Sequence, residues 1–493
     1  MTDISRMSRR TAAVVRDAVG ARPALSLATA GFLAASVTVV AGGRVGLPQS
    51  VIPLTNWLGL LPPNGHSSGD APGAVMVLGV VALLALWLVA IRMHHSRRVS
   101  ERTVWLVGAA WATPFVVGPP LLSNDVFTYA AQGLMLRRGL DPYSVGPAAL
   151  GNVRALAAVD PSWRSIPSPY GPLATTLQHL AIAISGGNPL GAALVFRALG
   201  VLCLVAIGLL AADLAGPRRI EALTIIVLNP LLLLHIVSAA HLDGAMCVLL
   251  LAAVVQANRR HWAVAIVLAV AAGAVKAPAF VAVLAIMAVH IQSLRGAQRW
   301  RTAARDTAIA AVSTTIVSVI VRDGWGWIHA LNAPALGHTA LAPASLLGDL
   351  LRPVVPAASF DDLSAGGRVT ALIAAGCIVV YLTVTARHRA LDRTVGYGML
   401  AVGVLSPVVY PWYLLGGIVC LAPTARAGRR DLVLLLSAIG CLLSPPGFSG
   451  GVSTALSVAA GLVALALVVP RMLARRRSAS AVPGDASKLT VDG

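Results

Sequence analysis

Long apolar runs dominate this chain and limit what it can fold into, because most of them could cross the hydrocarbon core of a bilayer as helices. Hydrophobic residues make up 57% of the 493 residues and charged residues 12%, whereas soluble domains carry about 25% charged residues. The pattern shows no strand periodicity and predicts an all-α polytopic membrane protein with about fourteen spans. The predicted spans lie near 24–42, 73–91, 103–121, 189–212, 220–238, 244–257, 262–275, 278–292, 306–321, 369–386, 395–409, 412–424, 431–445 and 452–470.

Basic residues set the predicted orientation of these spans. The chain has 38 Lys and Arg against 19 Asp and Glu, a formal net charge of +19. Most of the basic residues fall in alternate loops, and the positive-inside rule makes that face cytoplasmic, with both termini inside. We therefore expect a multi-pass protein of the plasma membrane, in contact with membrane lipids. Binding to nucleic acid is excluded, because it would need these charges on one continuous surface.

The spans divide the chain into predicted parts. These are a basic cytoplasmic N-terminus (1–23), three N-terminal transmembrane helices (24–121), a long extracytoplasmic loop (122–188), a transmembrane bundle (189–470) with an outer loop at 322–365, and a disordered basic cytoplasmic tail (471–493). We expect the first apolar run to be a retained helix, since no convincing signal-peptide cleavage site follows it. In the long loop we expect interfacial helices near 125–138 and 146–158. Residues 171–185 are also placed at the interface, because a crossing there would reverse every later loop.

One acidic residue is distinguished by its position. Asp125 follows Asn124 directly after an apolar run, at the predicted lip of the membrane. A carboxylate there avoids the cost of about 3 kcal/mol that it would have in lipid, and it can meet a membrane-bound substrate as a general base. The alternative is an N-cap for a helix over 126–138, since Asp and Asn are common before helical runs. The two roles can coexist.

Other polar residues lie at predicted outer positions. Asp141, in GLDPY, has the turn chemistry of Asp before Pro. Tyr170, in SPYGP, could form a wall of a site. His241 and Asp243, in HLDG, lie at an outer helix junction, where a polar pair is costly unless it is used or solvated. Two such groups without further His or Glu nearby are a weak metal signal, and we predict neither a metal nor a cofactor.

Cations on the predicted outer face are few. Lys276 is the only lysine before the C-terminal tail, and it could hold a phosphate as a point charge. Snorkelling of its side chain toward water is the alternative. Further outer cations that could form an anion pocket are Arg137, Arg138, Arg197, Arg322 and Arg352.

Several segments together resemble a known family. They are SNDVFTYAAQG (123–133), RRGLDPYSVGPAAL (137–150), SPYGPL (168–173), HLDG (241–244), KAP (276–278) and SPVVYPWYLL (406–415). In combination they look like the actinobacterial polyprenol-phosphate-mannose-dependent α-1,6-mannosyltransferases, of the GT-C class of membrane glycosyltransferases. The resemblance covers most of the chain, and the segments are specific only as a set. Where that family tends to read HPWY, this chain has Tyr410 before Pro411.

The resemblance implies a GT-C-like bundle that moves mannose from polyprenyl-phosphate mannose to a lipid-anchored α-1,6-mannan acceptor of lipomannan and lipoarabinomannan. Transfer would occur on the outer face of the plasma membrane, by inversion in a single displacement. In this class the base is an acidic residue in the first large outer loop, a position that Asp125 matches, so 122–188 is the expected catalytic loop. We assign to substrate binding Asn124, Tyr129, Asp141, Tyr170, His241, Asp243, Lys276, Arg137, Arg138, Arg322, Tyr410 and Trp412.

Two other functions remain open from the sequence. An arabinosyltransferase that uses polyprenyl-phosphate arabinose would keep the fold and change the sugar. A transporter or lipid flippase would also have many helices, but transporters usually carry internal repeats and polar residues near the midplane of the membrane. Here the polar residues lie at outer helix ends and in loops, which favours an enzyme.

Overall fold

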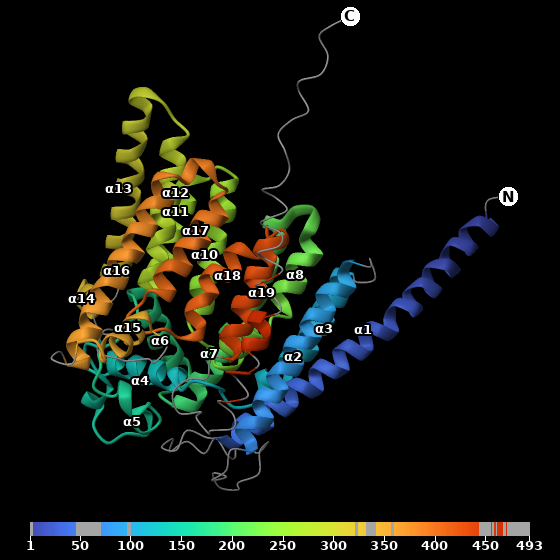
Figure 1. Cartoon of the computed structure of the whole chain (residues 1–493), viewed down its shortest axis with the longest axis horizontal. Coiled ribbons are helices and arrows are strands. Elements are labelled where there is room, and N and C mark those ends of the chain that lie inside the picture. The colour runs from blue at the N-terminus through green and yellow to red at the C-terminus, as the bar shows by residue number, and fades with distance from the viewer. Residues whose placement is uncertain are drawn as a thin grey trace, which may run out of the picture.

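The computed structural model describes residues 3–45, 71–95, 100–320, 324–331, 342–355 and 359–442, with a few positions between 455 and 470. Within these stretches every regular element is a helix (Figure 1), which confirms the all-α prediction. The site residue Arg322 and the tail at 471–493 fall outside the described residues, as do parts of the predicted span at 452–470 and of the outer loop at 322–365.

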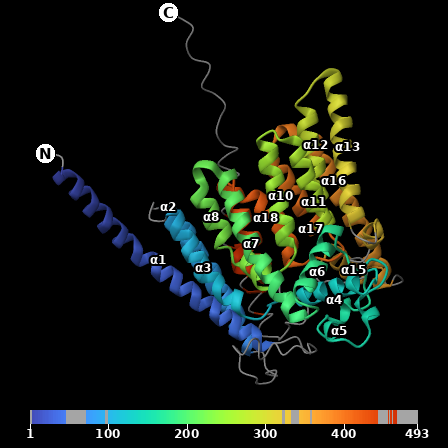
Figure 2. The ribbon, with the colours of Figure 1, turned by 180° about the vertical axis from the view of Figure 1, so that it is seen from behind.

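Three N-terminal helices pack together at one side of the molecule (Figure 2). They are α1 (Asp3–Val45), α2 (Ala71–His95) and α3 (Glu101–Val117). The indole N–H of Trp111 in α3 donates to the carbonyl oxygen of Leu27 in α1 at 3.1 Å. Gly31 makes room for this ring, since a Cβ there would stand 1.8 Å from Trp111 Nε1. The indole N–H of Trp87 in α2 donates to Thr224 at 3.1 Å and joins this group to the rest of the protein.

The remaining helices form the main body. They are α7 (Pro189–Ala215), α8 (Arg219–Val227), α9 (Pro230–Leu232), α10 (Asp243–Asn258), α11 (Trp262–Val275), α12 (Phe280–Gln292), α13 (Gly296–Ile320), α14 (Gly326–His329), α15 (Pro343–Leu351), α16 (Phe360–Val384), α17 (Leu391–Val404), α18 (Leu415–Leu421) and α19 (Ala427–Leu442). Figures 1 and 2 both show α10, α11, α12 and α17 as neighbours inside the body, with the α12–α13 connection at the end opposite the loop helices α4 to α6.

The long loop at 122–188 carries α4 (Asp125–Arg137), α5 (Arg154–Ala157) and α6 (Pro172–Ile184). Helix α4 agrees with the predicted helix at 125–138. The predicted helix at 146–158 is wrong in its extent, because Gly151 takes a φ of 70° and separates a short 3-10 turn from α5. With 13 residues, α6 is about 20 Å long, too short for a hydrocarbon core of about 30 Å.

Among the described residues, four helical stretches are long and apolar enough to cross a membrane, judged by length and composition. They are Pro23–Val45, Ala71–Met93, Pro189–Val227 and Asp361–Val384. A bent pair, Pro230–Ser238 with Asp243–Asn258, makes a fifth if it is counted as one span. Several other expected spans are apolar helices of 10–17 residues, because turns and prolines interrupt them. The chain is a membrane protein by these criteria, while the count of about fourteen spans stays a prediction.

The bend in that pair positions part of the candidate site. The helix axis turns by 119° across the break. A π-helix, η5 (Leu233–Ser238), ends there, and Ala240 takes a φ of 54°, a conformation that is uncommon for residues with a Cβ. The backbone N–H of His241 donates to the carbonyl oxygen of His235 at 3.0 Å. The HLDG segment therefore lies at the start of α10, as a corner rather than as part of a straight helix.

A buried arginine holds this corner against α3. The guanidinium of Arg197 donates to the carbonyl oxygens of Phe115, Val116 and Gly118 at 2.7–2.8 Å, and to that of Ser238 at 2.8 Å. The residue is 3% exposed. Its predicted place in an outer anion pocket is wrong, because its guanidinium satisfies main-chain carbonyls instead.

Candidate active site

A cavity of about 440 Å³ lies near the end of the molecule that holds α4 and α6. Seven of the residues assigned to the site from the sequence line it: Asp125, Tyr129, Tyr170, Asp243, Lys276, Tyr410 and Trp412. They come from α4, the loop before α6, the start of α10, the α11–α12 connection and the segment before α18. The fold therefore gathers side chains that are far apart in the sequence around one space.

Asp125 is the first residue of α4, and its carboxylate borders the cavity. Asn124 holds the N-cap position, so the proposal that Asp125 itself is the N-cap is wrong. Burial alone would raise the pKa of Asp125, but the hydrogen bond and charge of His241, together with the charge of Lys276, hold that pKa below its ordinary value. The side chain is therefore a carboxylate at neutral pH, the form that can accept a proton.

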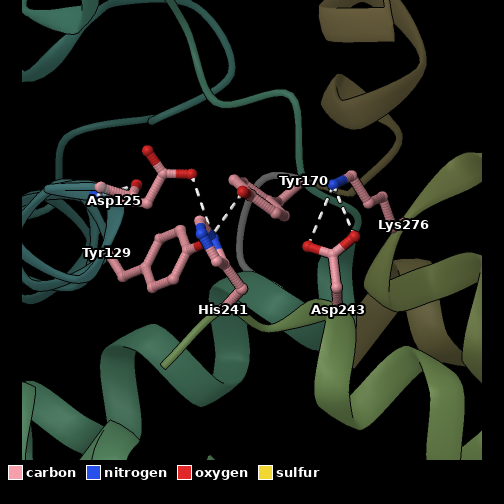
Figure 3. Close-up of polar contacts among 7 residues, drawn as sticks. Asp125, Tyr129, Tyr170, His241, Asp243 and Lys276 are labelled. Atoms are coloured by element: carbon pink, nitrogen blue, oxygen red, sulfur yellow. Dashed lines mark hydrogen bonds and ion pairs between the residues drawn. The ribbon is translucent and has the colours of Figure 1, made fainter. Parts of the chain in front are cut away.

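His241 contacts both acidic and phenolic groups of the site (Figure 3). Its Nδ1 lies 3.4 Å from Asp125 Oδ2 and 3.3 Å from the Tyr129 hydroxyl. A favourable contact with the carboxylate requires the proton on Nδ1. The imidazole stacks on Trp412 at 4.1 Å between ring centroids and 23° between planes. His241 is thus held flat against an aromatic ring with one nitrogen directed at Asp125.

Lys276 and Asp243 form a buried ion pair on another wall of the cavity (Figure 3). The Lys276 ammonium donates to both carboxylate oxygens of Asp243, at 2.8 and 3.0 Å. The side chains are 11% and 1% exposed, respectively. The ammonium also lies 4.3 Å from the ring centroid of Tyr413, within cation–π range. A lysine held in this way does not snorkel to the surface, and its charge borders the cavity.

Two tyrosines link these groups. The hydroxyls of Tyr129 and Tyr170 lie 2.9 Å apart. Burial, and after it the negative charges around them, raise the pKa of both phenols well above the ordinary value. Both therefore remain neutral hydroxyls, and because one donates to the other, the pair has one proton left to donate into the site.

The segment at 406–415 supplies an aromatic stack. Tyr410 lies parallel to Trp412, with 4.5 Å between ring centroids and 5° between planes. His241 covers the other face of Trp412. Tyr410 is therefore the outer ring of the stack, where a sugar could pack against it. Tyr413, which the sequence analysis did not single out, lies under Lys276; its place in the aromatic run YPWY was the available signal.

Helix α4 presents a polar stripe to the cavity. Asp125, Tyr129 and Gln132 all line it, and their spacing of four and three residues puts them on one helix face. The Gln132 side-chain oxygen accepts from the Ser168 hydroxyl at 3.1 Å. Gln132 was not predicted, although this spacing could have found it.

Other assigned residues lie elsewhere. The Asp141 carboxylate accepts from the backbone N–H of Tyr143 at 2.7 Å, which is the turn role that its sequence suggested. Asn124 is buried beside the cavity without lining it. Arg137 and Arg138 line a separate pocket. Within the described stretches, no three His, Cys, Asp or Glu side chains are arranged to hold a metal ion.

Apolar side chains line the rest of the cavity. Phe280, Val281 and Leu284 come from α12, and Met399 and Val402 come from α17. Leu284 is 51% exposed on the molecular surface. The cavity therefore combines charged groups with an apolar wall.

Comparison with known proteins identifies the family. The model described as "Alpha-(1->6)-mannopyranosyltransferase, N-terminal domain" matches residues 28–292, and the "MptB C-terminal domain" matches residues 360–475. The chain belongs to the alpha-(1->6)-mannopyranosyltransferase family. This confirms the resemblance drawn from the sequence segments, and it places the chain among the mannosyltransferases.

Similar proteins are known from species of Mycobacterium, Mycolicibacterium and Corynebacterium. Alpha-(1->6)-mannopyranosyltransferase A of Mycobacterium tuberculosis is 30% identical over 76% of this chain and 75% of its own length. Alpha-(1->6)-mannopyranosyltransferases A and B of Corynebacterium glutamicum are 25% and 27% identical, over 71% and 78% of this chain and 78% and 71% of their own lengths.

Proposed function

We propose that this protein transfers mannose from polyprenyl-phosphate mannose to an α-1,6-mannan acceptor of lipomannan or lipoarabinomannan, on the outer face of the plasma membrane. The observation that carries the proposal is the composition of one cavity. It holds the Asp125 carboxylate, the Lys276 ammonium and an apolar wall together. A lipid-linked sugar phosphate needs a base, a cation and an apolar surface in that combination.

Asp125 is the proposed general base. Its carboxylate removes the proton from the 6-hydroxyl of the acceptor mannose while that oxygen attacks the anomeric carbon of the donor. The new O6–C1 bond forms as the bond between C1 and the phosphate oxygen breaks. A β-linked donor then gives an α-linked product in one displacement, so the mechanism needs no covalent intermediate on the enzyme.

Lys276 is the proposed contact for the departing phosphate. The leaving group becomes a polyprenyl phosphate monoester and gains negative charge, which a fixed cation stabilises. Asp243 holds the ammonium at 2.8 Å and so keeps it in place. The phosphate would share the lysine with Asp243, and the Tyr129–Tyr170 pair would supply one further hydrogen-bond donor nearby.

The apolar wall is the proposed contact for the first isoprene units. Phe280, Val281 and Leu284 follow Lys276 in the chain and lie on the first turns of α12. A donor whose phosphate meets Lys276 can therefore place its lipid against this helix. Tyr410, at the open face of the aromatic stack, would support a mannose ring.

The test is transfer by the purified full-length protein in lipid vesicles. The donors are radiolabelled polyprenyl-phosphate mannose and polyprenyl-phosphate arabinose, and the acceptor is a short α-1,6-mannoside. We expect transfer from the mannose donor only, with an α-1,6 linkage in the product by NMR. Transfer from the arabinose donor alone would replace the proposal with an arabinosyltransferase. A lack of transfer from both donors, with GDP-mannose accepted instead, would refute the lipid-linked donor.

A further inference from the structure

A second pocket, of about 460 Å³, lies apart from the Asp125 cavity. It is bordered by the end of α4, the start of α5 and the turn between α6 and α7. None of its lining residues also lines the Asp125 cavity. Helix α4 connects the two sites, since it begins at Asp125 and ends at Arg137. These two residues are roughly 18 Å apart along the helix axis.

Three arginines converge on this pocket: Arg137, Arg138 and Arg154. All three are exposed, and within the described part of the chain none of them pairs with a carboxylate. No acidic residue lines the pocket. The Arg138 guanidinium donates to the carbonyl oxygen of Leu150 at 3.3 Å, so at least one of the side chains is oriented by the fold. Such a set of cations is complementary to an anion with several acceptor oxygens.

Two glycines line the pocket at the turn between α6 and α7. Gly186 and Gly187 have φ values of 64° and 89° at the α6–α7 turn. A Cβ on Gly187 would approach the Arg137 guanidinium at 3.7 Å, and one on Gly186 would meet nothing within 4 Å. There is therefore room beside the arginines for a bulky group such as a phosphodiester.

Apolar residues project from the two helices that meet at this turn. Leu180 and Ile184 on α6 are 52% and 64% exposed, and Leu194 and Leu202 on α7 are 38% and 66% exposed. A surface of this kind beside a cationic pocket fits an amphiphile, with the head group at the arginines and the acyl chains along α6 and α7. A soluble anion would make no use of the apolar part.

We propose that this pocket binds the phosphodiester head group of an anionic glycerophospholipid, in the leaflet on the same side of the membrane as Asp125. The bound lipid fixes the C-terminal end of α4 at head-group level. Asp125, at the other end of the same helix, is thereby held at a constant depth. This site is separate from the proposed donor site, and its test does not depend on transfer activity.

The experiment compares lipid binding by full-length variants in phosphatidylcholine nanodiscs that contain a spin-labelled phospholipid as the probe. Spin-labelled phosphatidylglycerol is compared with spin-labelled phosphatidylcholine. The test variant is Arg137→Gln/Arg138→Gln/Arg154→Gln. The control variants are the corresponding triple Arg→Lys protein and Arg352→Gln, which removes an exposed arginine at the end of α15.

We expect the wild type to prefer phosphatidylglycerol and the triple Gln variant to lose about a hundredfold of that preference at low salt, since each of the three cations favours an anionic lipid by about fivefold. The triple Lys variant should keep part of the preference, and Arg352→Gln should keep all of it. An unchanged preference in a folded triple Gln variant would overturn the proposal. Displacement of the lipid by inorganic phosphate at equal concentration would also overturn it, because the pocket would then be a site for soluble anions.

Discussion

Within the described residues the same three kinds of side chain come together twice, once around the start of α4 and once among α11, α12 and α13. Figure 1 shows α4 and the α12–α13 connection at opposite ends of the molecule. In each case an aspartate contacts a histidine that stacks on a tryptophan. The cavity trio belongs to the candidate active site and consists of Asp125, His241 and Trp412. The closed trio joins α11, α12 and α13 and consists of Asp306, His290 and Trp262.

In the closed trio the carboxylate has all its partners within the protein. Asp306 Oδ2 lies 2.6 Å from His290 Nδ1, and Asp306 Oδ1 lies 2.9 Å from the Arg305 guanidinium. Asp306 is fully buried, and Trp262 stacks on His290 at 4.3 Å and 9°. No member of this trio borders the Asp125 cavity. Such an arrangement holds three helices together and leaves no oxygen for a substrate.

In the cavity trio the contact is longer and one side is open. Asp125 Oδ2 lies 3.4 Å from His241 Nδ1, the Asp125 side chain is 20% exposed, and the carboxylate borders the cavity. The difference teaches that residue types alone do not separate a structural trio from a functional one. What separates them is whether a carboxylate oxygen remains available next to a space that can hold a substrate.

The largest expected effect comes from removing the two carboxylates in turn. Asp125→Asn should fold normally and lower turnover by about 10²–10⁴-fold, the usual effect of losing an acid–base group. Asp306→Asn should instead lower thermal stability, by about 1–3 kcal/mol for a disturbed buried hydrogen bond, with nearly normal turnover per folded molecule. Transfer rates and thermal unfolding of both variants check this. Near-normal turnover of a well-folded Asp125→Asn would remove the distinction between the trios.

The histidines should differ in the same direction, with a smaller effect on rate. His241→Asn should reduce turnover by about tenfold to a hundredfold, because Asp125 loses the group that orients it. His290→Asn should change stability and leave turnover unchanged. Steady-state rates at saturating donor and acceptor provide the measurement. If both variants lost turnover equally, His241 would be no more than a packing residue.

The pH profile tests how His241 acts. It helps to lower the pKa of Asp125 against the opposing effect of burial, so the base stays ionised as the pH falls until it reaches that lowered pKa. Protonation below that point removes the base and the rate declines. In His241→Asn the pKa of Asp125 should rise, and the acid limb of the kcat profile should move to higher pH. An identical acid limb in both proteins would show that His241 does not influence the ionisation of Asp125.

Lys276→Ala should raise the apparent KM for the polyprenyl-phosphate donor by about tenfold, the equivalent of 1.4 kcal/mol, with little change for the acceptor. Lys276→Arg should keep part of the affinity, since its charge remains and its geometry changes.

The controls separate loss of the cation from loss of stability. Lys276→Ala leaves Asp243 buried and unpaired, which is destabilising. The double variant Lys276→Ala/Asp243→Asn removes both charges and avoids that problem. Arg259→Ala breaks the exposed pair with Asp213, at 2.8 Å, and should have no effect on the donor. If Lys276→Ala and the double variant both kept the wild-type KM for the donor, Lys276 would not contact the donor phosphate, and Arg322 would be the next residue to test.

Much of the active-site region could be predicted from the sequence. Asp125, Lys276 and the HLDG segment stood out because charge is rare in apolar helices and each stood at a helix end. Their pairing could not be predicted, since the contact between Asp243 and Lys276 spans 33 positions of the chain and depends on the 119° bend. The sequence predicted a helix junction at this segment, but nothing in the local pattern gives the angle between the two helices.

The burial and the exact location of the arginine side chains could not be predicted from the sequence. Arg197 was placed outside by helix counting, yet it satisfies carbonyl groups at the end of α3. Arg137 and Arg138 were assigned to the donor phosphate with Lys276, but they stand at the far end of α4 in a separate pocket. Loop membership predicts the side of the membrane on which a residue lies. It does not predict which face of a short loop helix the side chain occupies.

The last prediction is that the two trios lie on opposite sides of the membrane. The cysteine substitutions that test it should leave activity unchanged. Ser144 lies in the loop that follows α4, and Gln298 lies in the first turn of α13, which carries Asp306 of the closed trio. Both residues are exposed. Cys377 is the exposed native cysteine within the described residues, while Cys203, Cys247, Cys420 and Cys441 are buried, so the background for labelling needs Cys377→Ala first. In that background, Ser144→Cys should react with a membrane-impermeant maleimide on intact cells, whereas Gln298→Cys should react only after permeabilisation, because the arginines around it mark a cytoplasmic loop.

Labelling of Gln298→Cys but not Ser144→Cys on intact cells would place the Asp125 cavity on the cytoplasmic side of the membrane. The donor would then have to be a sugar available inside the cell, such as a nucleotide sugar, and the cavity trio would act on the opposite side from the one proposed.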